Sequence, residues 1–387
     1  METMTSVERV AAAFEKRETD RVPVYHISAS YEVASALLGR EAYVGFGIQQ
    51  WREATALWNG PDAHHEFLQR TYEDTLAINR LYGNDIYRFT YPRCPLKPTR
   101  RIDEHTFLFE YGEEDQWKIL RHDPSQEHIN ILFDWKTKTS FTFEDLERDL
   151  AAREQAMGAR DESPRFSDDD PSVRAQKELG DVVAIRRGGG GISIPRDEIW
   201  LEAVALRPDL VERHLDLLVE SARTTTGPLI EFGFRYLFGG GDFAGNRGPF
   251  YSPRAFHDLV LPRLQQVTAH IHRHGGYSLF ASDGDLWSVA PDLFGASGVD
   301  GFYEIDRRAG MDLARLRETF PDLTLIGNIS SHTLHVGTKE EVVAETLSCL
   351  ETARKYNGII VGISNLPMPG TPVETLVAML ETIEQYR

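Results

Sequence analysis

The chain has 387 residues and a formal net charge of -18, and its apolar share of 41% and charged share of 26% are those of a globular protein. The negative charge argues against nucleic acid or a membrane surface as partner, because both require basic protein surface. No apolar run reaches the roughly 20 residues of a membrane span, and residues 1–9 lack the apolar core of a signal peptide. We therefore expect a cytoplasmic protein.

The two cysteines argue against further classes of protein. Cys94 and Cys349 are far apart in the sequence and stand outside any metal-binding spacing. This pattern argues against a disulfide framework and against a cysteine-based zinc site.

Short apolar segments alternate with helical patterns along most of the chain. Helices are predicted over residues 6–16, 31–39 and 52–81 (with a break at 59–62), from 142, from 171, over 209–231, from 286, over 342–350 and over 373–386. The alternation predicts βα units with a parallel sheet, here a single (β/α)8 TIM barrel over residues 1–387. The eight predicted strands are residues 21–27, 84–89, 181–187, 234–238, 277–281, 301–305, 323–328 and 358–364.

The alternation of strand and helix patterns is interrupted from about residue 91 to residue 175. Within this segment, 101–111 and 116–121 alternate apolar and polar residues on either side of 112–115. Period-two alternation across a turn predicts an antiparallel hairpin, inserted after the second strand.

Polar residues stand where the predicted strands end. In a barrel these ends converge on the face that carries the active site. The acids could transfer protons or hold a metal, and the arginines could bind carboxylates. The candidate catalytic residues are Asp242, Asp283 and Glu304; the candidate substrate-binding residues are His26, Arg88, Arg186, Arg187, Asn328 and Ser364.

Structural roles compete with these assignments. Asp283 could instead cap the following helix, and Glu304 could form an ion pair with Arg307 or Arg308. Residues 188–191 are four glycines without a phosphate-loop lysine, so we interpret them as a flexible loop over the site. His332 follows the seventh strand and could reach the barrel mouth.

Several motifs together resemble the uroporphyrinogen decarboxylase superfamily, which also contains cobalamin-linked methyltransferases. The resemblance covers nearly the whole chain outside the insertion and implies a (β/α)8 barrel. The motifs lie at residues 7–14, 19–24, 241–254, 282–284, 298–301, 309–312, 327–328 and 369–376.

The chain departs from the patterns of both activities. Residues 25–30 lack the arginines with which uroporphyrinogen decarboxylases bind substrate carboxylates. The positions that resemble the thiolate zinc ligands of the methyltransferases carry Ala281, Asp283 and Ser364. The resemblance therefore implies at most a zinc site without cysteine ligands, for which Asp283, Glu304 and His332 are the candidates.

Three functions follow as hypotheses. The first is a methyltransferase-like enzyme that moves a methyl group from a small methoxy-type or anionic substrate to a corrinoid held by a partner protein. The second is a decarboxylase without cofactor, in which Asp283 or Asp242 acts with Arg88 and Arg186. The third is a barrel that binds a ligand without catalysis. A homodimer is the default assembly.

Overall fold

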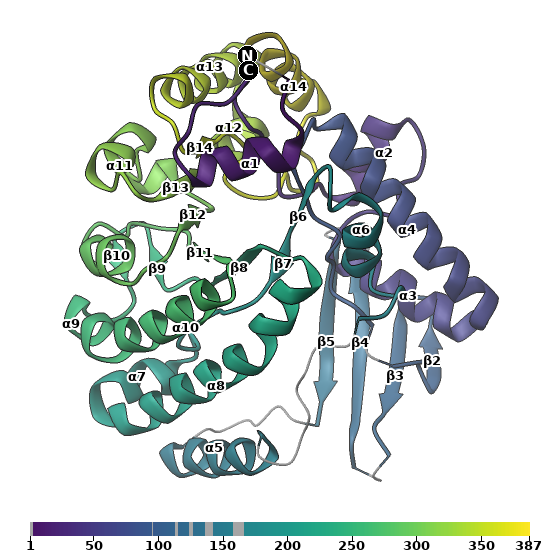
Figure 1. The fold of residues 1–387 in the computed structure, drawn as a ribbon. Helices are drawn as coiled ribbons and strands as arrows, with labels where there is room; N and C mark the ends of the chain where they lie inside the picture. The colour runs from purple at the N-terminus through teal and green to yellow at the C-terminus, as the bar shows by residue number, and fades with distance from the viewer. Residues whose placement is uncertain (1–2, 95, 113–114, 124–126, 136–141, 158–165) are drawn as a thin grey trace.

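The computed structural model describes residues 3–94, 96–112, 115–123, 127–135, 142–157 and 166–387. Short parallel strands lie in the middle of the molecule, and helices surround them (Figure 1). A separate antiparallel sheet extends from one side. The predicted α/β class with a parallel sheet is confirmed.

Two groups of parallel strands make up the centre. One is a pair, and the other has six strands in the order β14-β13-β12-β11-β8-β7. The pair is β1 (Ile86–Tyr87) with β6 (Ala184–Ile185), and the six are β7 (Arg187–Gly188), β8 (Tyr236–Gly240), β11 (Tyr277–Ala281), β12 (Gly301–Tyr303), β13 (Thr324–Ile326) and β14 (Ile359–Ile360).

Backbone hydrogen bonds connect these groups through the first predicted strand. Tyr25 N–H donates to the Val361 carbonyl over 2.9 Å, beside β14, and Asp85 N–H donates to the Val24 carbonyl over 2.7 Å, beside β1. β6 leads directly into β7. Each of the eight predicted strand regions is thus bonded to its neighbour in the predicted order. Because they are parallel, their carboxyl ends lie at one edge.

Helices flank the strands, and several predicted boundaries agree with the structure. The predicted break at residues 59–62 separates α3 from α4, where Pro61 occupies the first helical turn. The helices are α1 (Ser6–Phe14), α2 (Tyr31–Leu38), α3 (Gly47–Asn59), α4 (Pro61–Leu81), α5 (Phe143–Met157), α6 (Pro171–Leu179), α7 (Glu198–Leu206), α8 (Pro208–Phe232), α9 (Pro253–Ala255), α10 (Leu261–Arg273), α11 (Leu313–Thr319), α12 (Ser331–Val336), α13 (Lys339–Lys355) and α14 (Val373–Tyr386).

Shorter helical turns complete the set at Phe256–Val260, Pro291–Ala296 and Arg307–Ala309. The helix predicted from residue 286 is therefore wrong at its start, because Trp287 N–H is bonded to the Asp285 side chain in a turn. Among the described helices, none combines the length and the apolar character needed to cross a membrane.

The core has two parts separated by the strands. Side chains on the inner side, such as Ile86, Leu279 and Ile360, pack with Val10 and Phe14 of α1. The ring of Phe14 lies 4.8 Å from those of Tyr236 and Tyr277, so α1 covers the amino ends of the strands. The larger cluster packs the other helices against the outer side. Between these two clusters, the carboxyl edge of the strands is not covered by α1.

The insertion is larger than the predicted hairpin. It forms a four-stranded antiparallel sheet in chain order, with strands β2 (Arg100–Asp103), β3 (Thr106–Glu110), β4 (Trp117–Asp123) and β5 (His128–Asp134). The prediction of one strand over 101–111 is wrong, because Asp103 accepts a hydrogen bond from His105 N–H and turns the chain. β5 was missed, and residues 113–114 of the predicted turn lie outside the described part of the chain.

Buried ion pairs hold α1 to the strands. Arg9, 1% exposed, pairs with Asp85 over 2.6 Å and with Asp20 over 2.7 Å. Asp85 also accepts hydrogen bonds from Ser6 Oγ and Val24 N–H. Removing the guanidinium would leave a buried carboxylate without its main partner.

We expect Arg9→Ala to lower the free energy of unfolding by about 3–5 kcal/mol, because a buried charge loses its counterion. Arg17→Ala is the matched control, since Arg17 is 57% exposed in its pair with Glu15, and it should cost less than about 1 kcal/mol. Urea denaturation followed by circular dichroism measures both values. Equal losses in the two variants would contradict the structural role of Arg9.

Candidate active site

The Arg186 guanidinium lies among aromatic side chains at the carboxyl edge of the strands. Its Nη1 donates to the Tyr25 hydroxyl over 2.6 Å, and its Nη2 donates to the Tyr303 hydroxyl over 3.4 Å. Tyr303 in turn donates to the Gly239 carbonyl over 2.8 Å. The guanidinium also lies 4.5 Å from the ring centre of Phe238. These contacts fix the cation, yet none of the ion pairs seen in the described part of the chain gives it a carboxylate partner.

Arg88 adds a second cation to this edge. Its Nε donates to Thr90 Oγ over 3.0 Å, and its guanidinium lies 5.3 Å from the ring centre of Phe46. Burial, together with the nearby charge of Arg186, lowers the pKa of Arg88 to about 10. Two cations that repel each other in a desolvated place form a site for an anion.

Glu304 follows β12 and faces the same space. Burial is the main cause that raises its pKa to about 7, with Arg186 opposing the shift and Asp283 adding to it. Its backbone has φ of +64°, in the left-handed region that costs a residue other than glycine roughly 1 kcal/mol. A glycine would suit this backbone better, so the carboxyl group is present at a conformational cost.

Asp283 follows the neighbouring strand, β11. Burial raises its pKa to about 6, and the charges of Asp242 and Asp306 add to the effect. Asn365 Nδ2 donates to its Oδ2 over 3.0 Å, and its own N–H approaches Asp242 Oδ1 at 3.4 Å. Two carboxyl groups whose pKa values are raised toward neutral pH therefore stand at adjacent strand ends.

A cavity of about 390 Å³ opens beside these groups. Two glycine-rich segments form much of its wall, Gly189 and Gly191 after β7 and residues 239–241 at the end of β8. A Cβ at Gly239 would lie 2.9 Å from the Gly189 carbonyl oxygen, so the two backbones touch. Phe238, Asp242, Ala281, Tyr303 and Glu304 complete the lining. The glycines here allow two backbone segments to pack closely. Residues 188–191, which we expected to form a flexible loop over the site, instead form one side of the cavity wall.

The remaining predicted residues divide between the site and other places. Asp242 lines the cavity, with its side chain 39% exposed and 3.7 Å from Arg196. Arg187 is directed to Asp170, with which it pairs over 2.6 Å. His26 is fully buried against Tyr82, accepts from Ile363 N–H, and has its pKa lowered to about 3 by burial.

Asn328, Ser364 and His332 lie further along the chain. The Asn328 side chain is buried and donates to the Met311 carbonyl over 3.1 Å. Ser364 is buried and accepts from Ser331 N–H. His332 is exposed on α12. The contacts of Asn328 and Ser364 thus hold neighbouring backbone segments together.

The donor arrangement does not fit the non-cysteine zinc site. Within the described residues, no three His, Cys, Asp or Glu side chains gather closely enough to hold a metal ion. Asp283 and Glu304 are near each other, but the third predicted ligand, His332, is exposed on a helix.

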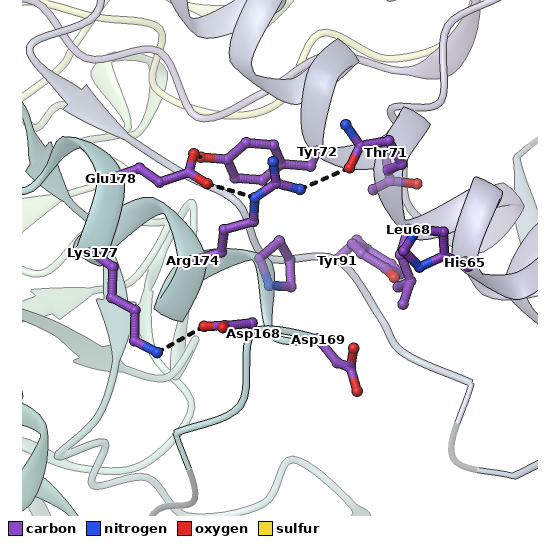
Figure 2. Close-up of a pocket in the computed structure, with 12 residues that line it drawn as sticks. His65, Leu68, Thr71, Tyr72, Tyr91, Asp168, Asp169, Arg174, Lys177 and Glu178 are labelled. Carbon is purple, nitrogen blue, oxygen red and sulfur yellow. Dashed lines mark hydrogen bonds and ion pairs between the residues drawn. The ribbon is translucent and has the colours of Figure 1, made fainter.

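A second cleft, of about 340 Å³, lies between α4 and α6 (Figure 2). Its charged groups pair with one another: Arg174 with Glu178 over 2.8 Å, and Lys177 with Asp168 over 2.8 Å. Tyr72 and Tyr91 supply apolar surface. Because its cations already have partners while those at the strand ends do not, we place the candidate active site at the strand ends.

The side-chain alternation of strands separates the residues that reach the site from those that do not. Tyr25 faces inward to Arg186 while His26 faces outward to Tyr82, and Arg186 faces inward while Arg187 faces outward. Sequence reasoning selected both arginines and chose His26 in place of Tyr25. Period two along each strand indicates which residues share a face, but it does not decide which of the two faces is the inner one, so Tyr25 and Tyr303 were missed.

Part of the site lies in a segment that is similar to known proteins. The model of the uroporphyrinogen decarboxylase (URO-D) family matches residues 198–386, which include β8 to β14 with Asp242, Asp283 and Glu304. This carboxyl-terminal part of the chain is therefore similar to the uroporphyrinogen decarboxylase family. A uroporphyrinogen decarboxylase from Anaeromyxobacter sp. (strain Fw109-5) is 30% identical over 129 residues, 33% of this chain and 36% of that relative. The likeness thus spans about a third of the relative's length.

A solved structure shows the same fold over the whole chain. The methyltransferase from Methanosarcina mazei superposes with a TM-score of 0.63 at 17% sequence identity, covering 99% of both chains. Arg88, Arg186 and the insertion lie outside the part that the URO-D family model matches. Both cations therefore lie in the part of the chain that the family model does not match.

The electrostatic coupling of Glu304 can be tested by its titration. We expect Asp283→Asn to lower the pKa of Glu304, because a like charge is removed, and Arg186→Met to raise it, because a cation is removed. Carbon-13 NMR of the glutamate carboxyl groups, with Glu304→Gln to assign the resonance, measures both shifts. A pKa of Glu304 that stays constant in both variants would contradict this geometry.

Proposed function

We propose that the chain is a methyltransferase-like enzyme that takes a methyl group from a small methoxy compound bearing a carboxylate. The observation that carries the proposal is the pair of carboxyl groups, Asp283 and Glu304, with pKa values raised to about 6 and about 7 beside two cations. The eight strand regions, bonded in circular order, support a closed (β/α)8 barrel whose mouth holds this site.

The two arginines would bind the carboxylate of the substrate. Arg186 is held by two tyrosine hydroxyls and Arg88 by Phe46 and Thr90, so both are positioned before the substrate arrives. A guanidinium is suited to this because its donors match the two carboxylate oxygens. The aromatic rings of Phe238 and Tyr303 would face the body of the substrate.

The protonated carboxyl groups would act on the leaving oxygen. When the CH3–O bond breaks, its electron pair stays on the oxygen, and Glu304 or Asp283 donates a proton there. The methyl group leaves to a nucleophilic acceptor. In this proposal the acceptor is a corrinoid carried by a separate protein, for which the structural likeness to a methyltransferase is the support.

A decarboxylase is the second candidate, and the unpaired arginines favour it. There the C–CO2 bond of a bound acid would break, and one of the two carboxyl groups would protonate the carbon left behind. The family match to uroporphyrinogen decarboxylase supports this alternative. Both candidates use the same proton donors and differ in the bond that breaks.

The test is to supply methoxybenzoates together with a reduced corrinoid acceptor, and to measure methylcorrinoid by absorbance and released CO2 in parallel. We expect Glu304→Gln to lower turnover by about 100-fold or more, and the exposed Glu66→Gln to leave it unchanged. CO2 without methylcorrinoid would select the decarboxylase. Binding with neither product would overturn both proposals.

The wild-type pH profile gives an independent check. A proton donor must be protonated to act, so turnover should fall as pH rises above about 7, the pKa of Glu304. The profile should lose this limb in Glu304→Gln at its residual rate. A rate that rises between pH 6 and about 8 would contradict the acid role.

A further inference from the structure

The turn between β4 and β5 carries a buried carboxyl group. Glu127 is 8% exposed although it belongs to the inserted sheet, whose turns are otherwise placed toward solvent at Asp103 and Glu104. Its backbone has φ of +54°, in the left-handed region. A buried charge on an inserted turn requires partners outside the insertion.

Those partners are backbone groups of the first two helices after the first strand. Tyr31 N–H donates to Glu127 Oε1, and the N–H groups of Glu32 and Phe46 also interact with the carboxylate. Tyr31 and Glu32 are the first residues of α2, and Phe46 precedes α3 without a side-chain cap of its own. One carboxyl group thus satisfies the starts of two helices.

Gly45 makes this contact possible. A Cβ at this position would lie 2.9 Å from Glu127 Oε2 and 2.8 Å from Ile48 Cγ2, and its φ is +136°. The backbone of residues 45–46 is therefore placed directly against the carboxyl group.

Phe46 connects this contact to the candidate active site. Its ring lies 5.3 Å from the guanidinium of Arg88. Arg88 otherwise has Thr90 as the hydrogen-bond partner of its Nε. Moving the backbone at Phe46 would take away the surface on which the guanidinium rests.

We propose that Glu127 is a positioning residue for Arg88, acting from the inserted sheet through the backbone and ring of Phe46. The substrate-binding consequence rests on the proposed function, in which Arg88 holds the substrate carboxylate. The positioning itself is independent of which reaction takes place. The insertion thereby supports the proposed anion site from outside, through Glu127 and the backbone of Phe46.

Chemical labelling of Arg88 tests the positioning without any substrate. We expect Glu127→Ala to speed the modification of Arg88 by phenylglyoxal, followed by mass spectrometry, by about 10-fold, because lost hydrogen bonds to a charged group free the Phe46 backbone. Glu127→Gln, which keeps an acceptor, should stay within about 2-fold of wild type. The exposed Glu104→Gln on the neighbouring turn is the control.

Hydrogen exchange of the amides of Tyr31, Glu32 and Phe46 gives the second measurement. These amides should exchange faster in Glu127→Ala, while the amides of the parallel strands keep their wild-type exchange rates. This comparison separates a local effect from a failure to fold. Labelling of Arg88 and exchange of these amides at wild-type rates in Glu127→Ala would overturn the proposal. Faster labelling combined with no turnover in the wild type would refute the proposed function alone.

Where turnover is observed, Glu127→Ala should change KM much more than kcat. Glu127→Ala should raise KM for a carboxylated substrate by about 10-fold with kcat within about 2-fold, because substrate binding is disturbed and the proton donors are not. An equal loss in a substrate without a carboxylate would contradict a path through Arg88.

The charge state of Glu127 gives the expected pH dependence of the contact. Burial raises its pKa from the ordinary 4.5 to about 7, with Glu32 adding to the shift and the three N–H groups opposing it, while Arg52 faces it from α3. A carboxyl group with a raised pKa favours the docked state at low pH, and this advantage is lost as pH rises through about 7. Labelling of Arg88 in wild type, normalised to Glu127→Gln at each pH, should therefore increase between about pH 4.5 and about pH 7 and level off above pH 7.

Discussion

Desolvation of charge at the carboxyl edge of the strands governs this site. Water is largely excluded from Arg88, Arg186, Asp283 and Glu304, so each group has to be stabilised by fixed neighbours or by a change of protonation. The arginines stay charged and rest on tyrosine hydroxyls and aromatic rings. The carboxyl groups respond with pKa values raised to about 6 and about 7, so that they gain and lose protons near neutral pH. This edge therefore combines fixed cations with acids that titrate near neutral pH.

Much of the fold could be predicted because local signals agreed with the global pattern. The strand regions are apolar and short, turn residues end them, and helices of ordinary length separate them. The break at Pro61 and the order of the parallel strands follow from such signals. The insertion was harder to predict, because its antiparallel pairing depends on the positions of turns. The turn at Asp103–His105 continues the alternating pattern of its flanking strands, so the sequence does not mark it. β5 lacked any partner that could be identified from the sequence.

The site was predictable to the level of which acids and arginines stand at strand ends. It was not predictable which of two adjacent residues faces inward, as His26 beside Tyr25 demonstrates, because a shift of one residue in strand register exchanges the two faces. The contribution of Phe46 and Glu127 could not be found at all. These residues are brought to Arg88 by contacts between segments 42 residues apart (Phe46 and Arg88) and 96 residues apart (Tyr31 and Glu127), which no local pattern encodes.

The glycine wall restricts how this site can change during evolution. A Cβ at Gly240 would lie 2.3 Å from the Ala281 amide nitrogen, and one at Gly239 would meet the Gly189 carbonyl, so side chains cannot be introduced there without moving two strands. Variation in the shape of the cavity is thereby left to its other lining residues, Phe238, Asp242, Ala281, Tyr303 and Glu304. Relatives that accept different substrates should accordingly differ at these positions while keeping the glycine segments.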